Sequence, residues 1–155
     1  MNIGLIKAGS FDLEIDVVSH DKDNHHVVED VALTLGGALL EALGDKKGIA
    51  RYGEKILPMD EALVLCAVDL SGRPYLCFDC DYTVPKIGEM DTEMFHEFFY
   101  AVSYSAGMNL HIKKINGSNN HHIAEASFKA FAKALDAATM YESRIDGVWS
   151  TKGVL

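Results

Sequence analysis

The sequence predicts an α+β fold made of two similar halves. Two patterns support this class: runs of alternating or β-branched residues, typical of strands, and runs whose apolar residues recur every three or four positions, typical of helices. A strand, a turn and a helix near the start of the chain are followed later by a second strand, turn and helix of similar sequence. We expect the two units to form one domain of 155 residues.

The first repeat, at about 10–70, begins with a predicted strand at 10–18, where polarity alternates. A helix is predicted at 25–43, because apolar residues lie one turn apart and a glycine suited to a helix end follows: Val27, Val31, Leu35, Leu39, Leu43 and Gly44. A polar loop at 45–55 and a strand at 62–70 complete this repeat.

The second repeat, at about 74–142, contains one additional helix ahead of the same unit. Its predicted elements are a strand at 74–82, a helix at 91–107, a strand at 108–116, a turn at 117–120 and a helix at 121–142. The segment Ser71-Gly72-Arg73 predicts a hairpin between the strand at 74–82 and the one before it. An irregular tail follows at 143–155. The first repeat lacks a counterpart of the additional helix, so we expect it to be truncated at its N-terminal side.

Composition and charge limit the kinds of partner. The net charge of −9 argues against a nucleic-acid-binding surface, which needs basic patches. No apolar run reaches membrane-spanning length and the N-terminus does not read as a secretory signal, so we expect a cytoplasmic protein that does not bind membranes. The cysteines Cys66, Cys77 and Cys80 are expected to be reduced. Because Cys77 and Cys80 would point to opposite faces of a strand, packing is favoured over a zinc or redox role for them.

A six-residue signature occurs twice, each time at the start of a predicted helix. Residues 24–29 read NHHVVE and residues 120–125 read NHHIAE. In a helix, the glutamate shares a face with the histidines three and four positions before it, so each copy offers two imidazoles and a carboxylate. The six candidate metal ligands are His25, His26, Glu29, His121, His122 and Glu125.

Mixed imidazole and carboxylate ligands favour Mn, Fe, Zn or Ni over Ca or Mg. Adjacent histidines lie about 100° apart around a helix axis, so we expect each to bind a different ion, with the other copy completing each ligand shell. The alternative is that these histidines and glutamates are helix-cap or surface residues. Because the signature occurs twice, this alternative is less favoured. A generic metallohydrolase is a further alternative. The single histidines, His20, His96 and His111, are expected to be surface or packing residues, with His96 the strongest exception.

Basic residues are few, so their positions are informative. Arg51, Arg73, Lys129, Ser150 and Lys152 are predicted to gather into a phosphate pocket of guanidinium groups, ammonium groups and a hydroxyl. Taken singly, each charged residue is more often a solvated surface group. The acidic pair at 60–61 opens the strand at 62–70, and the sequence leaves both a functional role and a solvent-facing strand end open for it.

Several segments together resemble the imidazoleglycerol-phosphate dehydratase family. They are NHHVVEDVALTLGGAL, KKGIARYG, LPMDEALV, DLSGRPYL, NNHHIAEASFKAFAKAL and STKGVL, and the resemblance covers nearly the whole chain. It implies two α+β halves with helices packed against mixed β-sheets, and a large homo-oligomer with active sites at subunit interfaces. It also implies a hydro-lyase of histidine biosynthesis that dehydrates D-erythro-imidazole-glycerol phosphate to imidazole-acetol phosphate, using two Mn²⁺ per active site.

Carried over by position, the resemblance assigns roles to individual residues. It implies one Mn²⁺ bound by His25, His121 and Glu125, and a second bound by His26, Glu29 and His122. It implies a substrate phosphate held by Arg51, Arg73, Ser150 and Lys152, with Lys129 close by as a catalytic-site residue. Two metals on the ring nitrogens would act as Lewis acids that stabilise an imidazolate, and Glu29 or Glu125 would then move the proton.

The chain departs from the family pattern at two places. The family's N-terminal arm, with a glutamate and a metal-binding histidine, has no counterpart, so three long helices are expected instead of four and apolar surface such as Val31 and Leu35 should be exposed. A further metal-binding histidine of the family aligns with Glu97, and either Glu97 or the neighbouring His96 is expected to replace it. The alternative function is therefore a truncated, catalytically impaired relative that only binds metal or partner subunits.

Overall fold

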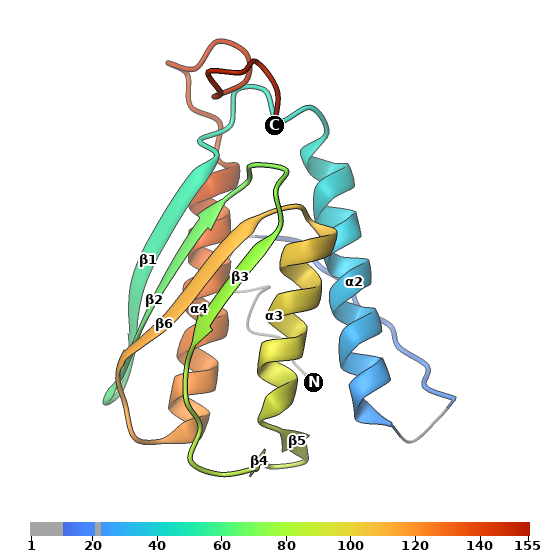
Figure 1. The fold of residues 1–155 in the computed structure, drawn as a ribbon, viewed down its shortest axis with the longest axis vertical. Coiled ribbons are helices and arrows are strands. Elements are labelled where there is room, and N and C mark those ends of the chain that lie inside the picture. The colour runs from blue at the N-terminus through green and yellow to red at the C-terminus, as the bar shows by residue number, and fades with distance from the viewer. Residues whose placement is uncertain (1–10, 21–22) are drawn as a thin grey trace.

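The computed structural model describes residues 11–20 and 23–155, and in these residues it contains three helices and a mixed four-stranded sheet (Figure 1). The sheet consists, in spatial order, of β1 (Tyr52–Met59), β2 (Ala62–Asp69), β6 (Asn109–Asn116) and β3 (Tyr75–Asp79). β2 is antiparallel to β1 and β6, whereas β3 is parallel to β6. A short ribbon of β4 (Lys86–Ile87) and β5 (Met90–Asp91) stands apart from the sheet. The predicted α+β class is confirmed.

The helices are α2 (Asn24–Leu43), α3 (Glu93–Ser105) and α4 (Asn120–Thr139). α4 packs on β1 and β2, α3 packs on β3, and α2 packs on α3 rather than on the sheet. The fully buried Phe99 of α3 has ring contacts with Phe128 and Phe131 of α4 and with Phe78 of β3, so α3 and α4 share one face of the sheet and the core lies between them. All three helices begin at the same end of the molecule (Figure 1).

The predicted helices are confirmed with small shifts at their ends. The helix expected at 25–43 spans Asn24–Leu43, and Gly44 follows it with a positive φ of 52° and a backbone N–H donated to the Glu41 carbonyl. The helix expected at 91–107 is shorter, and the one expected at 121–142 ends at Thr139. Periodicity therefore located the helices, and their ends differ from the predicted ends by at most three residues.

Two strand predictions were wrong. Residues 11–20 contain neither helix nor strand, because within the described chain no other strand pairs with them, and an extended segment needs hydrogen-bonded neighbours to form a sheet; residue 10 lies outside the described part. The predicted hairpin across Ser71-Gly72-Arg73 does not exist, since β6 lies between β2 and β3. β2 instead forms its hairpin with β1, which occupies part of the loop predicted at 45–55.

β1 was missed because its sequence is a poor strand sequence. It contains Gly53 and Pro58, both of which are disfavoured in central strands. β1 is an edge strand, where a proline can face away from the ladder, and Gly53 allows close approach to the backbone of α4 at Ala134. Pairing with β2 and packing against α4 therefore decide this element.

Gly36 and Gly37, adjacent in α2, are expected to respond oppositely to alanine. A methyl group on Gly36 would overlap Ser105 Oγ and lie 2.8 Å from the Val102 carbonyl oxygen, whereas one on Gly37 would meet nothing within 4 Å. We expect Gly36→Ala to destabilise the fold by about 1–3 kcal/mol and Gly37→Ala to stabilise it by about 0.5–1 kcal/mol. Urea unfolding of both variants measures this, and equal shifts in the two would contradict the described packing of α2 on α3.

Candidate functional site

The two signature copies begin their helices in the same way. The Asp23 side chain caps α2 by accepting from the His25 backbone N–H at 2.9 Å. The Asn119 side chain caps α4 by accepting from the backbone N–H groups of His121 and His122 at 2.9 and 3.3 Å. In each copy the two imidazole rings lie edge to face, with centroids 6.3 and 6.2 Å apart. The caps thus fix the backbone of both histidine pairs in the same way.

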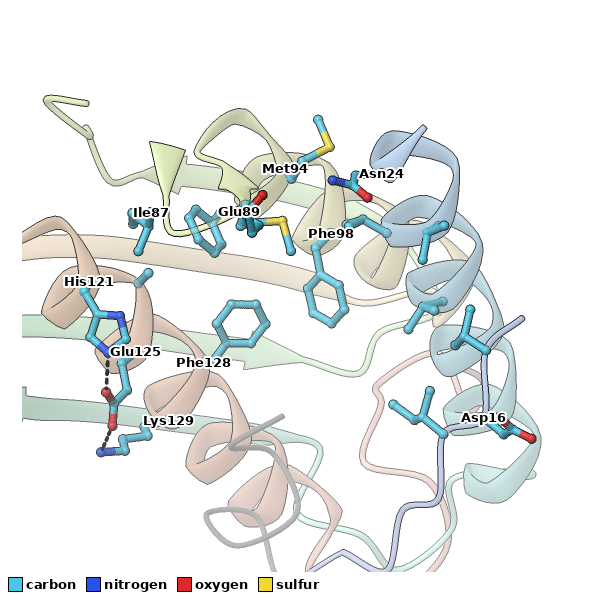
Figure 2. Close-up of a pocket in the computed structure, with 18 residues that line it drawn as sticks. Asp16, Asn24, Ile87, Glu89, Met94, Phe98, His121, Glu125, Phe128 and Lys129 are labelled. Carbon is cyan, nitrogen blue, oxygen red and sulfur yellow. Dashed lines mark ion pairs between the residues drawn. The ribbon is translucent and has the colours of Figure 1, made fainter. Parts of the chain in front are cut away.

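On α4, the Glu125 carboxylate lies between an imidazole and an ammonium group (Figure 2). Its Oε2 is 3.2 Å from His121 Nε2, and its Oε1 is 2.5 Å from Lys129 Nζ. The hydrogen bond from Lys129, assisted by the charges of Lys129 and His121, lowers the pKa of Glu125. Glu125 is therefore an ionised carboxylate next to an imidazole, which suits it to cation binding.

His122 lies between two carboxylates at the turn that joins β1 to β2. Its Nδ1 is 2.6 Å from Glu61 Oε2, and its Nε2 is 3.6 Å from Asp60 Oδ2. The hydrogen bond with His122, followed by one from the Asn119 backbone, lowers the pKa of Glu61 to about 2, and the Glu61 carboxylate raises the pKa of His122. The acidic pair at 60–61 thus lies beside a candidate metal ligand, while both side chains remain exposed to solvent.

The α2 copy does not meet the α4 copy within one chain. His26 lines a small cavity of about 220 Å³ together with His20 and Asp30, and its Nε2 lies 4.0 Å from Asp23 Oδ2. Among residues 11–20 and 23–155, three or more histidine, cysteine or acidic side chains do not gather closely enough to hold a metal ion. The predicted convergence of His25, His26 and Glu29 with the second copy is therefore not seen in a single protomer.

The main cavity separates the two copies. It has a volume of about 1070 Å³ and lies between α2, α3 and α4, with largely apolar walls such as Val27, Phe98 and Phe128 (Figure 2). His121, Glu125 and Lys129 line one side. The expected exposure of apolar surface on α2 is partly correct: Val31 lines this cavity, but the prediction for Leu35 was wrong, because Leu35 is buried in the core.

The remaining candidate ligands stand apart from these groups. His96 Nδ1 lies 3.3 Å from Glu97 Oε1 on α3, and its ring contacts Phe78 and stacks on Tyr100. His111 lies on the exposed outer face of the sheet, next to Tyr75. The cysteines are free; Cys77 is exposed and Cys80 is buried, so the two lie on opposite sides of the chain, as expected.

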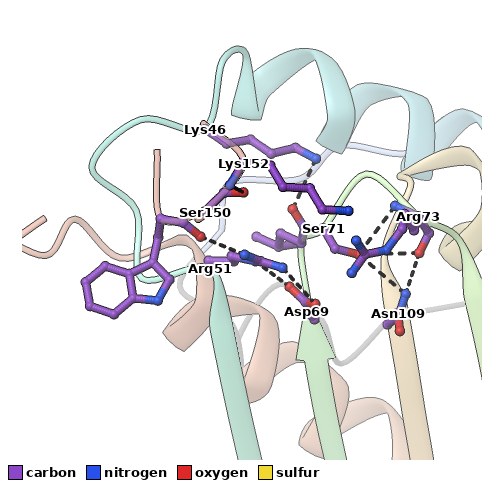
Figure 3. A network of polar contacts seen from close by, with 10 residues as sticks. Lys46, Arg51, Asp69, Ser71, Arg73, Asn109, Ser150 and Lys152 are labelled. Carbon is purple, nitrogen blue, oxygen red and sulfur yellow. Dashed lines mark hydrogen bonds and ion pairs between the residues drawn. The ribbon is translucent and has the colours of Figure 1, made fainter. Parts of the chain in front are cut away.

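A basic cluster forms where β1 begins and β2 ends (Figure 3). The buried Arg51 guanidinium binds both oxygens of Asp69, at 2.7 and 3.1 Å, and donates to the Trp149 carbonyl oxygen at 2.6 Å. These contacts bring the tail to the sheet, so Ser150 and Lys152 lie beside Arg51 and Arg73. The structure thus gathers four of the five predicted phosphate ligands. Lys129 does not join this cluster within one chain; it pairs with Glu125 in the middle of α4.

Sequence reasoning missed three members of the basic cluster. Lys46 is buried, its Nζ donates to the Leu70 carbonyl oxygen at 3.2 Å, and burial lowers its pKa. Asp69 orients Arg51, and Asn109 donates to the Arg73 carbonyl oxygen. Lys46 could have been suspected because basic residues are scarce, but the roles of Asp69 and Asn109 depend on strand pairing. Four cations around one carboxylate leave a surplus of positive charge suited to an anion.

The basic cluster and the histidines lie at opposite ends of α4. The Arg51 backbone N–H donates to the Ala138 carbonyl oxygen near the end of α4, whereas His122 is in its first turn. At about 1.5 Å per residue, these positions are roughly 24 Å apart along the helix. A small molecule cannot contact both groups in one chain, so a site that uses both needs residues from another copy.

A mixed sheet with helices on one face, imidazole and carboxylate groups at two helix starts and a basic cluster is compatible with an α+β enzyme that uses a metal ion. The sequence model of the family described as imidazoleglycerol-phosphate dehydratase matches residues 1–135. The chain therefore belongs to this family of metal-dependent hydro-lyases of histidine biosynthesis.

Comparisons with individual relatives support the same family. The chain is 61% identical to the imidazoleglycerol-phosphate dehydratase of Lachnoclostridium phytofermentans over 96% of its length and 76% of that protein, and 56% identical to that of Acetivibrio thermocellus over 96% and 77%. The crystal structure of the Staphylococcus aureus enzyme matches with a TM-score of 0.75 and 46% identity over 79% of this chain and 72% of that one. The Pyrococcus furiosus enzyme matches with a TM-score of 0.78 and 41% identity over 88% and 74%. In the described part of the chain, no helix has the length and apolar character needed to cross a membrane.

Proposed function

We propose that this chain dehydrates D-erythro-imidazole-glycerol phosphate to imidazole-acetol phosphate, with two Mn²⁺ in each active site and active sites formed between copies of the chain. The family membership supports the reaction. The proposal that active sites lie between copies rests on one observation: within one chain, the basic cluster is far from the histidines at the helix starts. The substrate is much shorter than this separation, because its phosphate is only a few bonds of roughly 1.5 Å from its imidazole.

The donors on α4 fit a divalent cation. Nitrogen and oxygen ligands lie at about 2.0–2.2 Å from a divalent ion such as Zn²⁺, so two neighbouring ligand atoms are roughly 3 Å apart. The 3.2 Å between His121 Nε2 and Glu125 Oε2 agrees with this spacing. We propose that His25, His121 and Glu125 hold one Mn²⁺ and that His26, Glu29 and His122 hold the other, with α2 and α4 contributed by different copies. His96 or Glu97 is the further candidate ligand.

When bound, the two cations would supply the Lewis acidity that stabilises an imidazolate and so makes the adjacent C–H acidic. The chain's own residues then hold the substrate and move the proton. Arg51, Arg73, Ser150 and Lys152 bind the phosphate and fix the diol. Glu29 or Glu125 takes the C–H proton and passes it to the leaving hydroxyl, which departs as water, and the resulting enol tautomerises to the ketone. Lys129 keeps Glu125 ionised through their ion pair.

We also propose that the chain is one domain of two repeats, at about 10–70 and 74–142, with 143–155 as a phosphate-binding tail. The support is local: α2 and α4 have 20 residues each, and their caps and histidine pairs have matching geometry. The outer face of the sheet exposes apolar side chains, including Tyr52, Ile56 and Tyr75, as expected for a surface that contacts other copies in a large homo-oligomer.

The test supplies Mn²⁺ and imidazole-glycerol phosphate to the full chain and follows formation of imidazole-acetol phosphate. Size-exclusion chromatography and metal analysis accompany the assay, and we expect a large assembly with two Mn²⁺ per chain and activity that a chelator removes. A chain that binds Mn²⁺ without turnover would contradict the proposal. That result would favour the alternative, a relative that binds metal but does not complete the reaction, for which the open cavity between α2, α3 and α4 is the supporting observation.

A further inference from the structure

Glu61 makes contacts that the proposed reaction does not explain. One carboxylate oxygen, Oε1, accepts from the backbone N–H groups of Ser118 at 3.3 Å and Asn119 at 2.7 Å, in the turn that leads into α4. The other, Oε2, lies 2.6 Å from His122 Nδ1. A single side chain on the β1–β2 turn therefore fixes both the N-cap of α4 and the ring of a candidate metal ligand.

The fold holds Glu61 itself in place. Its backbone carbonyl oxygen accepts from Asn116 Nδ2 at 2.9 Å, so the end of β6 ties down the turn. Asp60 adopts a positive φ of 48°, which directs the turn tightly from β1 into β2. Gly117 packs so closely on Ala62 and Ile123 that a methyl group there would lie 3.0 Å from each. These contacts hold the β1–β2 turn in place, and the turn in turn positions the Glu61 carboxylate next to His122.

The distances decide which ring nitrogen carries the proton. A contact of 2.6 Å is a short charge-assisted hydrogen bond, whereas 3.6 Å from Nε2 to Asp60 is outside hydrogen-bonding range. The neutral ring therefore carries its proton on Nδ1, donated to Glu61, and its Nε2 lone pair faces away from Glu61.

We propose that Glu61 is a positioning residue that fixes the orientation and tautomer of His122, so that Nε2 is presented to a divalent cation. The proposal rests on the role of His122 as a metal ligand proposed above. Carboxylates that accept from the second nitrogen of a metal-binding histidine act in this way, and losing one lowers metal affinity by about 10–100-fold.

The first test measures the tautomer in the metal-free full chain. Histidine ¹⁵N shifts are recorded at a pH where His122 is neutral, with the signal assigned by its loss in His122→Ala. The wild-type ring should carry its proton on Nδ1. In Glu61→Gln, the amide oxygen can still accept from Ser118 and Asn119, so the amide NH₂ faces Nδ1 and the proton should move to Nε2. The proposal is overturned if the wild-type His122 ring carries its proton on Nε2, or if Glu61→Gln leaves the proton on the same nitrogen as in wild type.

The second test measures Mn²⁺ binding by electron paramagnetic resonance of the free ion. Glu61→Gln should weaken binding by about 10–100-fold, while Glu54→Gln, an exposed glutamate of β1, should leave it unchanged. Thermal melting followed by circular dichroism verifies that both variants fold. Equal Mn²⁺ affinity of Glu61→Gln and wild type overturns the proposal. A folded wild-type chain that binds no Mn²⁺ overturns the proposed function instead, and the tautomer measurement still decides the role of Glu61.

Discussion

Replacing Glu125 with glutamine is expected to lower kcat/KM by about 10²–10⁴-fold, the range that a positioned proton-transfer group contributes. Glu125 joins His121 and Lys129 on one side of the main cavity, and its hydrogen bond from Lys129 lowers its pKa. Glutamine keeps the size of the side chain but removes the charge that both neighbours stabilise. Steady-state kinetics with Mn²⁺ and imidazole-glycerol phosphate measure the effect.

A control variant and a measurement of Mn²⁺ affinity help to interpret this result. Glu41→Gln changes an exposed glutamate near the end of α2 and should leave the kinetics unaltered. Mn²⁺ affinity of Glu125→Gln separates the two roles of the carboxylate: lost affinity assigns it to metal binding, and retained affinity with low kcat assigns it to proton transfer. Turnover of Glu125→Gln close to the wild-type rate would remove Glu125 from the active site.

Replacing Arg51 with alanine is expected to damage both stability and substrate binding. Arg51 makes three hydrogen bonds, to both oxygens of Asp69 and to the Trp149 carbonyl, while its side chain is only 9% exposed. Without it, Asp69 keeps a largely buried charge that has lost its partner. We expect a loss of about 2–3 kcal/mol, below the 3–5 kcal/mol typical of a fully buried pair, because Asp69 is 21% exposed. The tail should also detach from the sheet.

Kinetics and unfolding separate the two consequences. Losing a charged hydrogen bond to the substrate phosphate should raise KM by about 10–100-fold. Arg144→Ala is the matched control, because Arg144 is exposed and pairs with Glu142 only two residues away, so its loss should change stability by less than about 0.5 kcal/mol. The double variant Arg51→Ala with Asp69→Ala should be more stable than Arg51→Ala alone, but its KM should remain raised. An unchanged KM in Arg51→Ala would exclude the basic cluster as the phosphate site.

The helices could be predicted because their determinants are local. Apolar residues repeat at helical spacing along α2, and Gly44 stops the helix where the periodicity ends: Val27, Val31, Leu35, Leu39 and Leu43. The strands were predicted less well, since β1 depends on pairing with β2, and residues 11–20 resemble a strand without forming one. Strand order was also beyond the sequence: a short Ser71-Gly72-Arg73 connection suggested a hairpin, but β6 enters between β2 and β3 from later in the chain.

The sequence by itself determined which chemical groups this protein carries: two histidine–histidine–glutamate sets at helix starts, capped alike by Asp23 and Asn119, and a small set of basic residues. Only the tertiary structure decided where these groups lie. It brought Lys46 and Asp69 to Arg51 and turned Glu61 toward His122. The reason is that capping and helical spacing act over a few neighbouring residues, whereas these contacts depend on strand pairing and helix packing between segments far apart in the chain.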